Sequence, residues 1–223
     1  MKKETKKCIL ITVILLAAFV LWTLLVRFVD VKPIGPQGST VGFATLNAGF
    51  HNFTGVRMWL YTLTDWLGLV PIAFIIGFAL LGLIQWITRK SLRKVDYSIF
   101  VLGGFYVVVM AVFVLFEMLV VNHRPVLIDG RLEASYPSST TLLVMCVMST
   151  AIMQLNRRIK NRIFRRCVTW TLAVFAVFMV VGRLISGVHW LTDIVGGALL
   201  SAGLVVLYVS IQNTQKPKWF LGV

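Results

Sequence analysis

The sequence is divided into six long apolar runs, and this pattern constrains the fold more than any other feature. The runs lie near residues 8–28, 58–87, 98–121, 138–155, 167–185 and 190–211. A helix needs about 20 apolar residues to cross the hydrocarbon layer of a membrane. With 58% hydrophobic and only 13% charged residues, the chain does not have the composition of a soluble globular protein. We therefore predict an all-α integral membrane protein, a single domain over residues 1–223 built as a bundle of six transmembrane helices.

Basic residues are concentrated in the short segments between alternate runs. Sixteen of the 22 lie before the first run, between the second and third, between the fourth and fifth, and after the last: Lys2, Lys3, Lys6, Lys7; Arg89, Lys90, Arg93, Lys94; Arg157, Arg158, Lys160, Arg162, Arg165, Arg166; Lys216 and Lys218. The positive-inside rule places such segments in the cytoplasm, so both termini are expected there. The net charge of +14 therefore indicates membrane orientation and not a surface for nucleic acid.

The N-terminal run is expected to be a retained signal-anchor helix, because residues 26–30 do not form the small-residue cleavage site of a signal peptide. The three cysteines, Cys8, Cys146 and Cys167, are odd in number and match no metal-site spacing. We expect reduced thiols, no metal and no cofactor. The glycine pairs 103–104 and 196–197 are expected to let neighbouring spans approach closely.

The longest outer segment, residues 29–57, carries Phe43, Phe50 and Phe53. These aromatic residues suit a hairpin or a short helix lying in the membrane interface. Asp65, within the second span, is expected to pair with an arginine that the sequence does not identify. Trp190 suits either the aromatic belt of the membrane or the wall of a pocket.

The stretch 182–193 holds Arg183, His189 and Asp193 at the edge of an apolar span. Ionisable residues are costly in such a place and commonly mark a functional site. His189 and Asp193 are four residues apart, so on a helix they would share one face, with the carboxylate holding one ring nitrogen. The other nitrogen would be free to act as a nucleophile or base, and the arginine to bind an anion. The alternative is a structural ion pair of Arg183 with Asp193 beside a packed histidine.

Two further polar stretches are expected on the same outer face. Residues 117–125 end the third span with Arg124, and Pro125 terminates the helix. Residues 136–141 open the fourth span, where a serine after Pro137 suits an N-cap and the free amides of the helix start form an anion site. Two arginines, a helix N-terminus and a His–Asp pair are what phosphoryl transfer through a phosphohistidine needs.

These stretches resemble the three signature motifs of the type 2 phosphatidic acid phosphatase (PAP2) superfamily of membrane lipid phosphatases. The family pattern is Lys-x6-Arg-Pro, then Pro-Ser-Gly-His, then Ser-Arg-x5-His-x3-Asp. The spacing of Arg183, His189 and Asp193 reproduces the third motif without a gap. The dipeptide 124–125 matches the end of the first motif, and the dipeptide 137–138 matches the start of the second.

The resemblance implies a PAP2-like helical core and a role for each matching residue. His189 would be the nucleophile, Asp193 its orienting partner, and Arg183 a phosphate-binding residue of the catalytic group. Further phosphate contacts are expected from Arg124 and from the start of the fourth span, namely Ser138, Ser139 and Thr140.

The chain departs from the family pattern at three places. Glu117 stands where the first motif has lysine, Ser139-Thr140 replaces Gly-His in the second, and Gly182 replaces the serine of the third. A threonine hydroxyl is too weak an acid to replace an imidazolium, although it can donate a hydrogen bond to phosphate. His123 is a candidate proton donor, and the alternative is that it only caps the helix end or lies at the headgroup level.

The resemblance implies hydrolysis of a lipid phosphate or a prenyl diphosphate at the extracytoplasmic side of the plasma membrane. Without a general acid, an alkoxide leaving group is disfavoured, whereas a diphosphate releases a stable phosphate monoester anion. We therefore expect a preference for prenyl diphosphates, such as the bacterial cell-wall carrier lipid. The alternative is a degenerate relative that binds or transports an anionic lipid without hydrolysis, and a third interpretation is a channel or structural membrane protein. The expected partners are the lipid substrate and membrane lipids, not nucleic acid, and the oligomeric state stays open.

Overall fold

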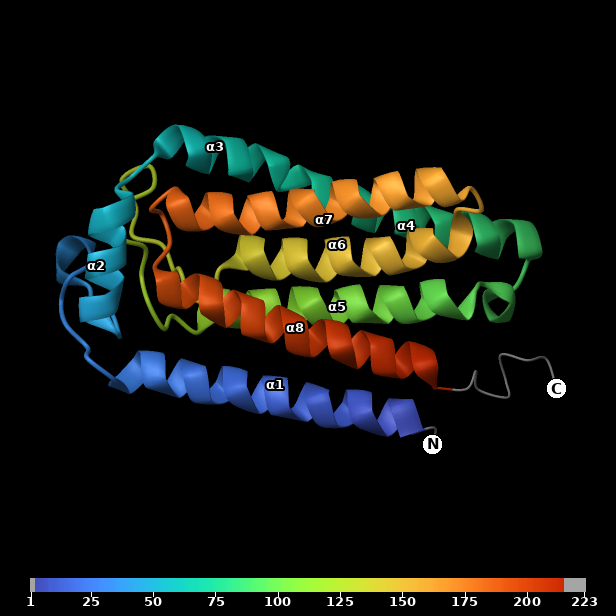
Figure 1. Ribbon diagram of the computed structural model, residues 1–223, viewed down its shortest axis with the longest axis horizontal. Coiled ribbons are helices and arrows are strands. Elements are labelled where there is room, and N and C mark those ends of the chain that lie inside the picture. The colour runs from blue at the N-terminus through green and yellow to red at the C-terminus, as the bar shows by residue number, and fades with distance from the viewer. Residues whose placement is uncertain (1–2, 215–223) are drawn as a thin grey trace.

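The computed structural model describes residues 3–214 and consists of helices joined by loops, the longest of which runs over residues 119–138 (Figure 1). The helices are α1 (Lys3–Phe28), α2 (Ala44–Thr54), α3 (Met58–Leu67), α4 (Leu69–Arg89), α5 (Tyr97–Met118), α6 (Ser139–Arg158), α7 (Arg162–Ile185) and α8 (Leu191–Asn213), with single 3₁₀ turns η1 (Pro36–Gly38) and η2 (Leu92–Lys94). Within residues 3–214, six helical stretches are long and apolar enough to cross a membrane. The predicted all-α bundle of six spans is therefore confirmed.

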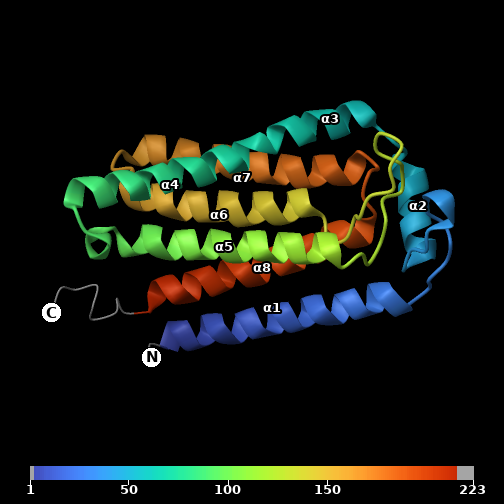
Figure 2. The ribbon, with the colours of Figure 1, turned by 180° about the vertical axis from the view of Figure 1, so that it is seen from behind.

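The loops fall into two groups at opposite ends of the bundle. The start of α1, the end of α8 and the α4–α5 and α6–α7 loops lie at one end, which we call the basic end because it holds the expected cytoplasmic segments (Figures 1 and 2). Lys2, Lys216 and Lys218 lie outside the described residues. At the other end, which we call the motif end, α2 lies across the bundle (Figure 1). Which end faces the cytoplasm stays a prediction.

The observed spans differ from the predicted ones mainly where local hydrogen bonding overrides hydropathy. The second span is one apolar stretch, Met58–Arg89, interrupted at Gly68 between α3 and α4. The fifth begins at Arg162, five residues earlier than predicted, because the side chain of Asn161 accepts the amides of Ile163 and Phe164 at 2.9 and 3.0 Å. Such an N-cap lets a helix begin inside a basic, non-apolar segment.

The core lies along α6 and α8. In each of them half of the most apolar 18-residue stretch is buried, against 11–28% of the corresponding stretch in the other spans. Glycine makes this possible on α8: a Cβ at Gly203 would lie 2.7 Å from Leu16 of α1, and one at Gly196 would lie 2.6 Å from the Tyr136 ring. The close approach predicted for the first glycine pair is wrong. A Cβ at Gly103 or Gly104 would meet no described atom within 4 Å.

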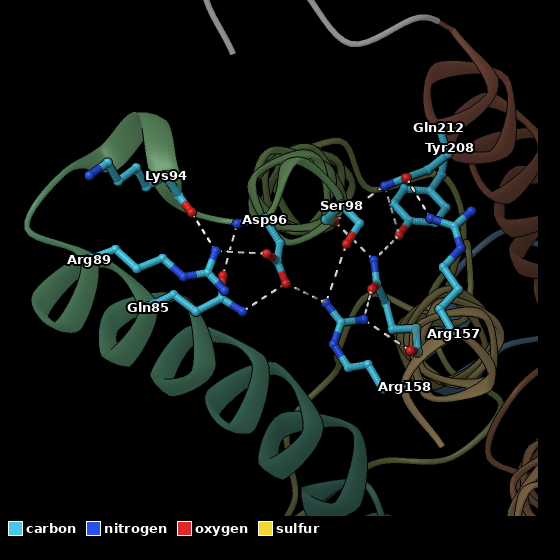
Figure 3. Close-up of polar contacts among 10 residues, drawn as sticks. Gln85, Arg89, Lys94, Asp96, Ser98, Arg157, Arg158, Tyr208 and Gln212 are labelled. Atoms are coloured by element: carbon cyan, nitrogen blue, oxygen red, sulfur yellow. Dashed lines mark hydrogen bonds and ion pairs between the residues drawn. The ribbon is translucent and has the colours of Figure 1, made fainter. Parts of the chain in front are cut away.

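At the basic end, a partly buried polar network joins four helices (Figure 3). Gln154 of α6, which is fully buried, donates hydrogen bonds to the Tyr208 hydroxyl of α8 at 2.6 Å and to the Ser98 carbonyl of α5 at 2.9 Å. Arg158 donates to the Ser98 hydroxyl at 3.3 Å and lies 3.8 Å from Asp96, whose other partners are Gln85 and Arg89 of α4. Because unpaired polar groups are costly in an apolar surrounding, this network fixes the register of α4, α5, α6 and α8.

The predicted short helix of the segment 29–57 is present as α2, and it is attached to the first turn of α8. Asn47, fully buried, donates to the Thr192 hydroxyl at 3.0 Å and accepts the Thr192 amide at 3.3 Å. Phe53 is 86% exposed, as an interfacial residue would be. Phe43 instead stacks on Trp22 with ring centroids 5.3 Å apart, so it packs within the protein.

Candidate active site

The third motif spans the turn between α7 and α8. Arg183 lies in the last turn of α7, His189 in the loop, and Asp193 in the first turn of α8. The loop turns at Gly187, which has a φ of +71°, and a Cβ there would lie 2.1 Å from the Gly55 carbonyl oxygen. Both the left-handed backbone and the close approach require glycine. The expectation that His189 and Asp193 share one helix face is therefore wrong, because α8 begins only after the histidine.

Asp193 instead reaches His189 by bending back over the start of α8. Its Oδ2 accepts the Trp190 amide at 2.9 Å and lies 3.7 Å from Nδ1 of His189. Its Oδ1 accepts a hydrogen bond from the Asn122 side chain at 3.4 Å. The carboxylate is fully buried, and Nδ1 of His189 is buried without a hydrogen-bond partner among residues 3–214. The pair is thus in contact but not hydrogen-bonded.

His189 is buried and held in its neutral form. Burial of the ring, followed by the positive charges of Arg124 and Arg183, lowers the pKa of His189 well below its usual value. Its Nε2 lies 3.5 Å from Nη1 of Arg124. A guanidinium can only donate, so this contact requires a lone pair on Nε2 and places the ring proton on Nδ1, beside Asp193. The nitrogen that bears the lone pair therefore points toward an arginine.

Arg124 enters the site from the loop between α5 and α6. Its guanidinium Nε lies 3.0 Å from the Glu133 carboxylate, and its amide donates to the Glu133 carbonyl at 3.0 Å. The side chain is almost buried, with Nη1 directed at His189. The first and third motifs, 65 residues apart at this contact, are thus brought together as expected.

Arg183 is held by one face of α3. Its Nη2 lies 3.5 Å from the Asp65 carboxylate, and its Nη1 lies 3.5 Å from the Tyr61 carbonyl and from the Thr64 hydroxyl. The guanidinium carbon lies 4.7 Å from the centroid of the Tyr61 ring. The arginine that pairs with Asp65 is therefore Arg183, and the ion pair of Arg183 with Asp193 is not the one that forms.

The second motif places the start of α6 against the third. Ser138 is the N-cap, as predicted: its Oγ accepts from the Thr141 amide at 3.4 Å, and its own amide donates to the Asp193 carbonyl at 3.0 Å. Ser138 is fully buried, whereas Ser139 and Thr140 are half-buried. The amides of the first helical turn therefore lie beside the His189–Asp193 pair.

A small cavity lies beside His189 and the start of α6. Its lining includes His189, Ser139 and Ser135, together with Glu117 at the end of α5. Glu117, an exposed residue, is thus among the residues that line the same cavity as His189.

His123 and Trp190 meet next to this cavity. The carbonyl of His123 accepts a hydrogen bond from the Trp190 indole at 2.7 Å, and the backbone of His123 also pairs with that of Ala134 in an isolated β-bridge. The Trp190 ring, 3% exposed, packs 5.5 Å from the His51 ring of α2. Trp190 is therefore a wall of the site and not a belt residue.

Four neighbours of the site escaped the sequence reasoning: Tyr61, Asn122, Glu133 and His51. Asn122, Glu133 and His51 carry no local signal in the sequence, because their contacts depend on how distant helices and loops pack. For Tyr61 the sequence does hold a signal: it lies four residues before Asp65 in an apolar helix, which places an aromatic ring beside a carboxylate.

Comparison with known proteins agrees with this arrangement. The sequence model of the PAP2 superfamily matches residues 119–217. The crystal structure of the first transmembrane PAP2 type phosphatidylglycerolphosphate phosphatase from Bacillus subtilis superposes with a TM-score of 0.61 over 92% of this chain and 97% of that one, at 17% sequence identity. No curated protein matches the chain in sequence. Arg124, Ser138, Arg183, His189 and Asp193 all lie inside the segment that is similar to the PAP2 superfamily, and this multi-pass membrane protein has the fold of a membrane PAP2 phosphatase.

Proposed function

We propose that this protein is a membrane phosphatase that hydrolyses a lipid phosphate or prenyl diphosphate through a phosphohistidine intermediate. The observation that carries the proposal is the neutral, buried His189, with Nε2 facing Arg124 at 3.5 Å and Nδ1 facing Asp193 at 3.7 Å. A histidine that only packs would not need a lone pair directed at a guanidinium and a carboxylate behind it. The similarity of residues 119–217 to the PAP2 superfamily and the PAP2-type fold support a phosphatase of this class.

In the first step, Nε2 attacks the phosphorus while the bond to the leaving oxygen breaks and its electron pair departs with the leaving group. Arg124, Arg183 and the amides at the start of α6 stabilise the non-bridging oxygens. A phosphate entering between Arg124 and Nε2 takes over as acceptor of the guanidinium and frees the lone pair. The Ser138 hydroxyl caps α6 by accepting from the Thr141 amide and hydroxyl, and its own O–H can still donate to a phosphate oxygen, as can those of Ser139 and Thr140.

Asp193 stabilises the positive ring that forms when His189 is phosphorylated. The contact of 3.7 Å must shorten to a hydrogen bond, and catalytic hydrogen bonds commonly tighten only when substrate binds. In the second step, water attacks the phosphorus, the P–N bond breaks, and inorganic phosphate leaves while the ring returns to its neutral form.

The leaving group is the basis for the substrate preference. The second-motif histidine of the family is Thr140 in this chain, so an alkoxide would leave without a strong acid at that position. A diphosphate leaves as a phosphate monoester and barely needs that proton. We therefore propose prenyl diphosphates as the preferred class, with His123 as the candidate proton donor for poorer leaving groups.

The site is proposed to face the extracytoplasmic side of the plasma membrane. It lies at the motif end, opposite the basic loops that the positive-inside rule places in the cytoplasm.

A second candidate function is lipid binding or transport without hydrolysis. The observation that favours it is that each arginine already has a carboxylate partner, Glu133 for Arg124 and Asp65 for Arg183, while Glu117 adds a third carboxylate at the cavity. The surviving His–Asp pair favours the phosphatase, because a binding protein gains little from a nucleophile.

Phosphate release by the purified protein separates the two functions. The substrates are a prenyl diphosphate, phosphatidic acid and phosphatidylglycerol phosphate, and the matched control is His189→Gln. The phosphatase proposal expects release by the wild type, greatest with the diphosphate, and none by the variant. Binding of vanadate with no release from any substrate would establish the binding function instead.

A further inference from the structure

We infer that α3 is a positioning element of the phosphate site: Tyr61 holds both arginines in place, and Asp65 is a counter-ion of Arg183 that the substrate phosphate displaces. The inference rests on the proposed function and adds two residues that lie outside all three motifs. α3 lies along the motif-end half of α7 (Figure 1), so one helix of the second span forms a wall of the site.

The Tyr61 ring is shared by the two arginines. The guanidinium carbon of Arg183 lies 4.7 Å from the ring centroid, and that of Arg124 lies 6.0 Å away. Two positive groups repel each other, and the negative face of an aromatic ring lowers the cost of bringing them together. The ring therefore holds both guanidiniums at the place where one phosphate can bridge them.

Contacts between α3 and the end of α7 fix the position of the Tyr61 ring. Tyr61, Thr64 and Asp65 lie three and four residues apart, on one face, and all three contact Arg183. Gly182 permits the approach, because a Cβ there would lie 2.8 Å from the Thr64 methyl group. The Arg57 amide, at the start of α3, donates to the Ser186 carbonyl at 2.9 Å. The helix is thus fastened to the end of α7 on both sides of Tyr61.

In the ion pair of Arg183 with Asp65, a phosphate can replace the Asp65 carboxylate. The Arg183 side chain is 2% exposed and fixed, whereas that of Asp65 is 60% exposed on the bundle. Because the 32-residue stretch Met58–Arg89 is longer than the about 20 residues that cross the hydrocarbon layer, Asp65, near its motif-end start, can turn toward the headgroup region. Their separation of 3.5 Å is long for a charge-assisted hydrogen bond, which is typically about 2.7–2.9 Å. Asp65 therefore neutralises the buried arginine in the free protein and is replaced when a phosphate arrives. After hydrolysis, its return helps inorganic phosphate to leave.

Two substitutions on this helix have opposite expected effects on the binding of orthovanadate to the purified full-length protein. Tyr61→Leu removes the ring and should weaken binding roughly tenfold, with a rise in KM, whereas Tyr61→Phe keeps the ring face and should bind like the wild type. Asp65→Asn removes the competing charge and should tighten binding roughly three- to tenfold, while kcat falls because phosphate leaves more slowly.

Matched controls separate positioning from general effects. Trp66→Leu makes the same kind of change on α3 at a ring that is 70% exposed, and Asp129→Asn removes a carboxylate from an exposed loop at the same end of the bundle. Both should bind vanadate like the wild type. A merely structural role for α3 would lower the melting temperature of the variants without moving vanadate affinity in opposite directions.

The outcomes are distinguishable from those of the proposed function. A wild type that neither binds vanadate nor releases phosphate refutes the proposed function, and the inference falls with it. If the wild type is active but Tyr61→Leu binds vanadate normally, or Asp65→Asn binds it equally or more weakly, the inference alone is overturned. Should Tyr61→Leu fail to fold, the sign of the Asp65→Asn effect decides.

Discussion

Replacing Asp193 by asparagine separates the two roles that this buried carboxylate combines. Its charge lies 3.7 Å from the ring that becomes positive on phosphorylation, and its oxygens also bond the Trp190 amide and the Asn122 side chain. At an effective dielectric constant of about 20, two unit charges at this separation attract by about 4 kcal/mol, an upper estimate of the loss in the transition state. We therefore expect Asp193→Asn to lower kcat by roughly 10²- to 10³-fold.

The same substitution should have a smaller effect on stability. An asparagine can still accept the Trp190 amide, so the start of α8 is kept. When its oxygen accepts the Trp190 amide, its NH2 group takes the place of the oxygen that now lies 3.4 Å from the Asn122 NH2 group. Two NH2 groups cannot hydrogen-bond to each other, and the lost hydrogen bond costs about 1–2 kcal/mol. The expected result is a modest fall in melting temperature with a large fall in kcat.

Asn122→Ala is the control, because it removes the hydrogen bond to Asp193, together with the acceptor of the Gly42 amide, and leaves the carboxylate in place. It should share the loss of melting temperature while kcat stays within a few-fold of the wild type. The assay is phosphate release from a prenyl diphosphate in detergent micelles, with melting followed on the same samples. If Asp193→Asn kept kcat within about threefold of the wild type, the carboxylate would not assist His189, and the reasoning would be refuted.

Four further predictions concern topology, leaving group, pH and packing. In a background without native cysteines, a thiol reagent outside intact cells should label Asp129→Cys but not Asn161→Cys; the reverse pattern would invert the proposed orientation. Thr140→His, alone or with Glu117→Lys, should raise turnover of phosphate monoesters more than that of diphosphates. In the otherwise wild-type protein, His123→Ala should reduce monoester turnover if His123 supplies the proton and leave it unchanged if it does not. Burial lowers the pKa of His189 and of His51, so the folded state favours their neutral forms. Their contribution to the free energy of unfolding is therefore present above pH about 6.5 and is lost as the pH falls below it. Between pH 7 and 5, the melting temperature should drop by less in the double variant His51→Gln/His189→Gln than in the wild type. Tyr208→Phe should lower stability by about 1–3 kcal/mol, measured as a lower melting temperature, because it removes a partner of the buried Gln154 amide (Figure 3).

Hydropathy predicted the six spans because the membrane requires each of them to be long and apolar, whatever its neighbours are. It placed the start of α7 too late because a side-chain cap at Asn161 adds a helical turn that is not apolar. It also could not tell which glycines pack closely against another segment of the chain. Gly196 and Gly203 do, whereas Gly103 and Gly104 do not, and that difference depends on how the helices are rotated in the bundle.

The site was predictable as far as its motifs reach. Motif spacing brought Arg124, Arg183, His189 and Asp193 into one neighbourhood, and the structure places them there. It could not supply Tyr61, which lies 122 residues from Arg183 in the sequence, or Asn122, which lies 71 from Asp193. These partners follow from tertiary packing, to which no local pattern corresponds.

The spacing of the third motif has a physical reason different from the one that its four-residue interval first indicates. His189 is not on α8, so no shared helix face brings it to Asp193. The aspartate is the third residue of α8 and folds back to accept the amide of Trp190, at the position before the helix. In doing so, its oxygen reaches the side chain of the residue that precedes Trp190, which is His189. One residue more or less between them would leave either the helix start or the imidazole without its carboxylate. The interval is therefore the one at which a single buried charge can both begin a helix and orient a nucleophile.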